Sequence, residues 1–251
     1  MRLANEQMLD RESVWRRIEV EHPEFLPWMD PLNNYHAVRE IVLGGSVTWR
    51  GVHERFTPAG KRVMDIGANA GIWSAFCGAN GAHVDAYEPF LRPFAVLSGT
   101  IGTCNLQKYV KAFNSAIWTY TGIVPYFGHV STLDNVCPAF NGGLLTDGVK
   151  WTPDDKQNSE MVKCISLDDA IGDETWDMVK IDVEGAEFEI LLAASPAKLN
   201  QIKFMYIEFH PWAGQQLYDR TIAKLTELFK FEGVEKREDG RWEAAYLSTL
   251  G

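Results

Sequence analysis

The sequence predicts a doubly wound α/β fold built on a mostly parallel sheet, and three observations support this prediction. From Lys61 onward, short apolar runs rich in β-branched residues alternate with helical segments, as in parallel strands joined by crossover helices. A turn punctuated by glycines follows the first of these runs. The chain has 251 residues, enough to bury one large core. We therefore expect one main domain, residues 58–251, after an N-terminal extension, residues 1–57.

The expected elements follow in order along the main domain. The predicted strands are Arg62–Ile66, His83–Tyr87, Val110–Phe113, Met178–Ile181 and Phe204–Phe209. The predicted helices are Gly71–Ala79, Arg92–Thr103, Ala186–Ala194 and Gly214–Phe229. Near the C-terminus, Gly233–Lys236 and Trp242–Leu247 flank a turn at Glu238–Arg241, which predicts a hairpin. This hairpin would complete a seven-stranded sheet with an antiparallel pair.

Two segments fall outside this alternation. Residues 1–57 show helical spacing of apolar residues over Asn5–Val20 and again over Tyr35–Val42, which predicts a helical cap. A loose arm or a contact between copies of a homo-oligomer is the alternative for this extension. Residues 120–162 are rich in Gly, Asp, Asn and Pro and contain extended pieces such as Gly122–Phe127. We interpret them as a lid insertion, with a plain surface loop as the alternative.

Composition narrows the function classes. The formal net charge is -10 and no run of Lys or Arg could follow a phosphate backbone, so we expect no nucleic-acid partner. The 4 cysteines lack zinc-site spacing, which indicates free thiols in a reducing compartment. The charged N-terminus resembles neither a secretory signal nor a membrane anchor. These features predict a cytoplasmic protein with no membrane partner.

The segment Val63–Gly71 combines a buried strand, a tight turn and the start of a helix. Gly67 allows the sharp turn, Asn69 tolerates the left-handed conformation, and Gly71 lets the helix approach the sheet. Asp65, at the strand end, can accept hydrogen bonds from loop amides or, through them or water, from the ammonium group of a ligand. The segment therefore predicts a loop whose backbone lies against a cofactor.

Acidic and polar residues at the next two strand ends suit an adenosyl group. Glu88 follows the second strand, where a carboxylate can accept hydrogen bonds from both ribose hydroxyls. Asn114 and Ser115 follow the third strand, where either could bond the edge of adenine; both are equally typical of a turn.

The loop departs from the dinucleotide fingerprint G-x-G-x-x-G, because position 69 is Asn and position 72 is Ile. That fingerprint places a diphosphate at a helix N-terminus. S-adenosylmethionine carries no phosphate, so the departure favours this methyl donor as the cofactor.

Two later strings resemble a known family. Ile165–Asp169 and Asp177–Glu187, the second containing Lys-x-Asp-x-Glu-Gly-x-Glu, closely resemble the FkbM family of S-adenosylmethionine-dependent methyltransferases. The Asp65–Gly71 loop, Glu88-Pro89 and Tyr206–His210 also look like that family's pattern, in the same order. The resemblance implies the class I methyltransferase (Rossmann-like) fold and methyl transfer to a hydroxyl oxygen of a small molecule or saccharide.

Methyl transfer is an in-line displacement, so the protein must align the acceptor and remove its proton. Residues at alternating strand positions share a face, so Lys180, Asp182 and Glu184 should project together, as should Glu208 and His210. We expect Asp182 to lie beside the cofactor's methyl group and His210 to be the general base. Lys180 would pair with Asp182 or Glu208, or lower the pKa of the acceptor. An ion pair of Lys180 with Glu184 that orders the following turn is the alternative.

We expect no metal, but one alternative uses the same residues. Asp182, Glu208 and His210 could together hold a divalent cation, and the histidine would suit Mn²⁺ or Zn²⁺ better than Mg²⁺.

Other polar and aromatic residues receive structural interpretations or remain open. We expect Asp168 and Asp169 to cap a short helix, Asp169–Ile171. Four aromatic residues near the expected mouth could stack on a planar acceptor or pack in the core: Trp118, Tyr120, Trp151 and Trp212.

Two other functions stay open from the sequence. A nicotinamide-dependent oxidoreductase could use a similar sheet, but the loop and the missing Tyr-x-x-x-Lys pair disfavour it. A non-catalytic binding or scaffold protein could keep the methyltransferase fold without its chemistry.

Overall fold

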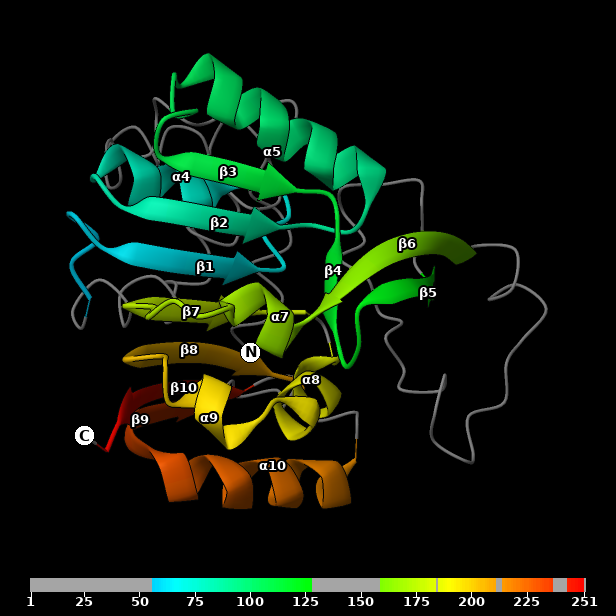
Figure 1. Cartoon of the computed structure of the whole chain (residues 1–251), viewed down its shortest axis with the longest axis vertical. Helices are drawn as coiled ribbons and strands as arrows, with labels where there is room; N and C mark the ends of the chain where they lie inside the picture. Colours follow the sequence, from blue (N-terminus) through cyan, green and yellow to red (C-terminus); the bar gives the residue numbers. More distant parts are fainter. Residues whose placement is uncertain (1–55, 128–158, 184, 211–213, 237–242, 251) are drawn as a thin grey trace, which may run out of the picture.

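A computed structural model describes residues 56–127, 159–183, 185–210, 214–236 and 243–250 (Figure 1). The strands are β1 (Arg62–Ile66), β2 (His83–Tyr87), β3 (Val110–Phe113), β4 (Ala116–Trp118), β5 (Gly122–Phe127), β6 (Ser159–Ser166), β7 (Met178–Ile181), β8 (Phe204–Phe209), β9 (Phe229–Lys236) and β10 (Glu243–Thr249). The helices are α4 (Ile72–Ala79), α5 (Leu91–Thr103), α7 (Leu167–Ile171), α8 (Glu187–Ala193), α9 (Pro196–Leu199) and α10 (Gln215–Leu228).

The main sheet has seven strands in the order β3-β2-β1-β7-β8-β10-β9. Pairing is parallel from β3 to β8, whereas β10 lies between β8 and β9 and runs antiparallel to both. The hairpin is therefore present as predicted, but only β10 opposes the common direction. Its predicted turn, Glu238–Arg241, lies outside the described residues.

The five predicted parallel strands are confirmed with the same bounds, and the four predicted helices begin and end within one residue of their predicted limits. These elements could be predicted because their buried side chains recur at the regular spacing of a strand or a helix. In β1, Met64 and Ile66 face one core cluster, and Val63 faces the other. All four residues of β7 are buried, as expected for a central parallel strand.

Two hydrophobic clusters cover the two faces of the sheet. One contains the buried side chains of α8 and α10, including Phe188, Leu191 and Leu225. The other contains those of α4 and α5, including Trp73 and Leu97. Burying each large apolar side chain contributes about 1.5–3 kcal/mol, so these layers hold the strand ends in fixed relative positions. The doubly wound fold is confirmed.

A second sheet lies beyond the carboxyl ends of the main strands (Figure 1). It has the order β4-β6-β5, with β6 parallel to β4 and antiparallel to β5. The extended piece Gly122–Phe127 is thus confirmed as a strand, whereas β4 and β6 were not predicted. Trp118, on β4, is 2% exposed and belongs to the core, so it is not a stacking residue of the mouth.

Several predictions from the sequence fall wholly or mainly outside the described residues. They are the helices of the N-terminal extension, the lid role of residues 120–162, of which 128–158 lie outside the described residues, and the positions of Trp151 and Trp212. Of the described helices, none is long and apolar enough to cross a membrane. Cys77, Cys104 and Cys164 are free thiols.

The prediction for Asp168 and Asp169 is wrong. The short helix α7 begins at Leu167, and its cap is Ser166, whose hydroxyl oxygen accepts from the Asp169 amide at 3.0 Å. The Asp168 carboxylate instead accepts from the amide of Ser195 at 2.9 Å. It therefore joins two segments of the chain rather than capping its own helix.

We expect Gly67→Ala to destabilise the protein by about 3 kcal/mol or more, because Gly67 has a φ of 80° and its Cβ would lie 1.9 Å from the Asp182 carbonyl oxygen. Urea unfolding monitored by circular dichroism measures the change in the free energy of unfolding. The matched control is Gly99→Ala in α5, where a Cβ meets nothing within 4 Å. That change should stabilise by about 0.5–1 kcal/mol. Equal unfolding midpoints for Gly67→Ala and the unmodified protein would contradict the account.

Candidate active site

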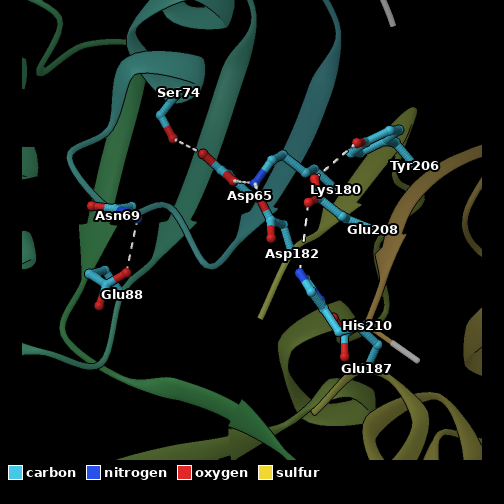
Figure 2. A network of polar contacts seen from close by, with 10 residues as sticks. All are labelled: Asp65, Asn69, Ser74, Glu88, Lys180, Asp182, Glu187, Tyr206, Glu208 and His210. Carbon is cyan, nitrogen blue, oxygen red and sulfur yellow. Dashed lines mark hydrogen bonds and ion pairs between the residues drawn. The ribbon is translucent and has the colours of Figure 1, made fainter. Parts of the chain in front are cut away.

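Polar side chains gather where β1, β2, β7 and β8 end (Figure 2). The strand order reverses between β1 and β7, since the chain builds outward to β3 on one side and to β8 on the other. Open α/β sheets bind ligands at the carboxyl ends of strands beside such a reversal. The sheet topology thus places the candidate site.

The loop after β1 has the conformation that the sequence predicts. Gly67, Asn69 and Gly71 all have positive φ, at 80°, 49° and 80°. The amides of Gly67 and Ala68 both donate to the Tyr87 carbonyl, at 3.1 and 3.0 Å, which anchors the turn to the end of β2. The left-handed conformation of Asn69 is confirmed.

The role predicted for Gly71 needs a correction. A Cβ on Gly71 would lie 2.2 Å from Cδ1 of Leu97, a residue of α5. Gly71 thus permits the close approach of the neighbouring helix α5. Gly67 is the residue that lies against the sheet, because a Cβ there would clash with the carbonyl group of Asp182, just after β7.

Glu88 joins this loop to the start of α5. Its Oε2 accepts from the Asn69 amide at 2.9 Å, and its Oε1 accepts from the Phe90 amide at 3.0 Å. The side chain is only 5% exposed, and burial raises the pKa of Glu88 to about 7, although the two amides lower it. Each carboxylate oxygen has a second lone pair, so Glu88 can also accept from ribose hydroxyls as predicted.

Asn114 and Ser115 are engaged with backbone atoms. The Asn114 side-chain amide donates to the carbonyls of Glu88 and Pro89, at 3.0 and 2.8 Å. The Ser115 hydroxyl donates to the Lys163 carbonyl at 3.2 Å, which ties the main sheet to β6. Their predicted contact with adenine stays a prediction, and for Asn114 it would use Oδ1.

Lys180 is a buried ammonium between two carboxylates. Its Nζ lies 3.2 Å from Oδ2 of Asp182 and 3.5 Å from Oδ1 of Asp65. Burial by itself lowers the pKa of Lys180, but Asp182, Asp65 and Glu208 together raise it above its usual value. The predicted pairing of Lys180 with Asp182 is confirmed, and Glu184 lies outside the described residues.

Asp65 has different partners from those that the sequence suggests. It is fully buried and accepts from the Ser74 hydroxyl at 2.5 Å, in addition to its ion pair with Lys180. Burial raises the pKa of Asp65, although Lys180 and Ser74 lower it. Since its hydrogen-bond donor is a side chain of α4, the prediction of loop amides as its donors is wrong.

His210 lies at the end of β8, with a carboxylate near each ring nitrogen (Figure 2). Nδ1 contacts Oε1 of Glu187, and Nε2 lies 3.7 Å from Oε1 of Glu208. The hydroxyl of Tyr206 donates to the other oxygen of Glu208 at 3.3 Å. Sequence reasoning gave Glu187 no role, and the only signal for it was its place as the last residue of the Lys-x-Asp-x-Glu-Gly-x-Glu string.

The structure brings together the residues predicted to act on the acceptor. Asp182, Glu208 and His210 each offer one ligand atom, and these atoms lie within 4.8 Å of one another. This spacing would allow a divalent cation to bridge them, and it places two carboxylates near an imidazole that could take a proton from an acceptor. Tyr120, by contrast, is 46% exposed in the turn between β4 and β5.

Comparison with known proteins was made on the sequence and on the fold. The model of the "Methyltransferase FkbM domain" matches residues 65–231, which is more than half of the chain. The chain is 27% identical over 205 residues to the AMB antimetabolite synthetase AmbE of Pseudomonas aeruginosa, a match that covers 71% of this chain and 10% of that protein. It is 25% identical over 173 residues to methyltransferase sdnD of Sordaria araneosa, covering 60% of this chain and 67% of that protein.

Two solved structures resemble the fold. Methyltransferase FkbM from Methylobacillus flagellatus KT has a TM-score of 0.49 at 16% identity, covering 94% of this chain and 61% of that one. An rRNA methylase from Streptococcus thermophilus has a TM-score of 0.49 at 10% identity, covering 84% of this chain and 96% of that one.

The matched region contains the Gly67–Gly71 loop, Glu88, and the Lys180 to His210 cluster described above. Its seven-stranded, mostly parallel sheet with the single reversed strand β10 agrees with the class I, Rossmann-like methyltransferase fold that the resemblance implies. This chain belongs to the FkbM methyltransferase family.

Proposed function

We propose that this protein transfers a methyl group from S-adenosylmethionine to a hydroxyl oxygen of a small molecule or saccharide. One observation carries the proposal. A loop suited to the cofactor, with Glu88 beside it, and a cluster able to take a proton lie at the same edge of the sheet, on either side of the reversal between β1 and β7 (Figure 2). Family membership implies the methyl donor. The hydroxyl acceptor is what the resemblance implies, and a cluster with a candidate base supports it.

The residues present fit S-adenosylmethionine. Glu88 offers a buried carboxylate for paired hydroxyls, and it accepts from the amide of Asn69 in the left-handed turn between Gly67 and Gly71. Among the described residues, the carboxylates of Asp65, Asp182 and Glu208 lie near one ammonium, that of Lys180. This excess of acidic groups favours a ligand that carries a sulfonium and an ammonium.

The bound cofactor supplies a methyl carbon activated by a positively charged sulfur. The chain's own residues must then orient the acceptor hydroxyl and take its proton as the carbon–oxygen bond forms and the carbon–sulfur bond breaks, which would leave S-adenosylhomocysteine. Nε2 of His210 is the atom that we assign to accept this proton, and the carboxylate of Glu208 at 3.7 Å would stabilise the resulting imidazolium. Lys180 lies 3.2 Å from Asp182 and would hold it in the position that we predict beside the methyl group.

The choice of acceptor has separate support. The net charge of -10 opposes binding to a nucleic-acid backbone. The name of AmbE describes the synthesis of an antimetabolite, which supports a small-molecule acceptor here. Membership of a methyltransferase family disfavours the nicotinamide alternative. The tests below also distinguish two alternatives. In one, a divalent cation bridges the cluster in place of a general base; in the other, the protein binds the cofactor without turnover.

Glu88→Gln should weaken S-adenosylmethionine binding about tenfold or more, because an amide offers one acceptor oxygen and presents an NH₂ group to a backbone amide. Isothermal titration calorimetry gives the Kd, and a thermal melt confirms that the variant is folded. The control is Glu174→Gln, an exposed carboxylate that precedes β7 at the opposite edge of the sheet. If both variants bind like the unmodified protein, Glu88 does not hold the ribose.

Cofactor affinity should also depend on pH through Glu88. Because burial raises the pKa of Glu88 to about 7, the carboxylate is mostly protonated at pH 6 and mostly ionised at pH 8. If only the ionised form accepts both hydroxyls, binding should be about tenfold weaker at pH 6 than at pH 8. Calorimetry in two buffers of different ionisation enthalpy should show proton release at pH 6. The dependence should vanish in Glu88→Gln, and its persistence there would assign it to another group.

His210→Gln should lower kcat by about 100-fold or more and change the Kd for S-adenosylmethionine less than twofold. The assay follows formation of S-adenosylhomocysteine over a panel of saccharides and hydroxylated small molecules. Treatment with EDTA should leave the rate of the unmodified protein unchanged. A rate lost to EDTA and restored by Mn²⁺ would favour the bridging cation, and cofactor binding with no turnover on any acceptor would favour a binding protein.

A further inference from the structure

We propose that Glu187 is a positioning residue that fixes the tautomer of His210. In this tautomer Nδ1 carries the proton, and Nε2 presents its lone pair to the acidic cluster, which Asp182 and Glu208 form. The catalytic consequence rests on the proposed function. The tautomer itself does not, because it is a property of the folded protein alone.

The contact between the two residues is buried and long-range. Glu187 is fully buried and His210 is 2% exposed, and the two come from the start of α8 and the end of β8. Oε1 of Glu187 meets Nδ1 of His210, while Nε2 lies on the side of Glu208 (Figure 2). Glu187 therefore orients the ring through Nδ1, which is the nitrogen that does not face Glu208.

The chemistry of the two groups assigns the proton. An ionised carboxylate has no hydrogen to donate, so the imidazole Nδ1 must be the donor in this contact. A neutral imidazole carries only one N–H, which leaves Nε2 as the atom with a lone pair. Glu187 therefore selects the form of His210 that can accept a proton at the cluster.

Two neighbouring aromatic rings keep Glu187 and His210 opposite each other. Phe188 follows Glu187 and Phe209 precedes His210, and both phenylalanines are fully buried. Their rings stack with centroids 5.4 Å apart and an interplanar angle of 27°. This contact fixes α8 against β8 one residue away from the pair, so neither side chain needs backbone movement to maintain it.

Burial of Glu187 gives no evident benefit to stability. Its Oε2 has no hydrogen-bond partner among the described residues, and a carboxylate buried with an unsatisfied oxygen is costly. A glutamine of the same shape keeps a polar atom at that position but removes the buried charge, so Glu187→Gln should fold. Its NH₂ group can donate to Nδ1, which selects the opposite tautomer with the proton on Nε2, whereas its oxygen can accept from Nδ1–H as the carboxylate does. Glu187→Gln therefore no longer restricts His210 to one tautomer.

The test is long-range ¹H–¹⁵N correlation NMR on protein labelled with ¹⁵N-histidine, treated with EDTA and free of acceptor. The sequence has 6 histidines, and His210→Gln identifies the signals of His210. Spectra are compared at a pH where a titration shows that ring to be neutral. We expect the Nδ1–H form in the unmodified protein, a shift toward the Nε2–H form in Glu187→Gln, and the Nδ1–H form again in Glu187→Asp.

The matched control is Glu189→Gln, the same chemical change two residues further along α8. It should leave the tautomer of His210 as it is. The Nε2–H form in the unmodified protein, or an unchanged tautomer in Glu187→Leu, which offers Nδ1 no acceptor, would overturn the proposal.

Kinetics then measure the consequence for catalysis. On any acceptor that the unmodified protein methylates, Glu187→Gln should lower kcat about 10- to 100-fold with little change in KM for S-adenosylmethionine, and Glu187→Asp should recover part of the loss. If the spectra show the expected tautomers but no hydroxyl acceptor is methylated, the proposed function fails while the assignment to Glu187 stands. If kcat is unchanged in Glu187→Gln although its tautomer has switched, Glu187 does not position a base.

Discussion

The ammonium of Lys180 lies between a carboxylate at the end of β1 and another just after β7, and the arrangement of the site depends on it. Asp65 belongs to the cofactor loop, and Asp182 belongs to the acidic cluster. A single buried cation therefore joins both halves of the site across the reversal of the sheet. Without it, two acidic groups would face each other in a region of low dielectric, and one of them would take up a proton.

The acidic residues of the site accept from different kinds of donor, either backbone amides or side chains. This difference matches the different roles that we propose for them. Glu88 accepts from two backbone amides, so it is fixed by the loop and by the start of α5. Glu208 and Asp182 are held by the side chains of Tyr206 and Lys180. A carboxylate fixed by backbone suits a binding task that does not change during the reaction. Carboxylates in a side-chain network can share charge and protons with His210.

These buried polar groups are supported by the core and do not replace it. Burying ions costs free energy that a pair returns only in part, so the cluster is weak evidence for stability. The aliphatic and aromatic layers on both faces of the sheet supply the stabilisation. The stack of Phe188 on Phe209 illustrates the connection, since an apolar contact places a glutamate and a histidine within reach of each other.

Local periodicity in the sequence determined the five parallel strands, their helices, the left-handed turn at Asn69 and the meeting of Lys180 with Asp182, because each depends on residues near one another in the chain. Only the tertiary structure decided the pairing of β4 with β6, the contact of Gly71 with α5, and the partner of His210. Glu187 and His210 are 23 residues apart, on different elements. Whether such side chains meet depends on how α8 packs against β8, and no spacing along one element encodes that.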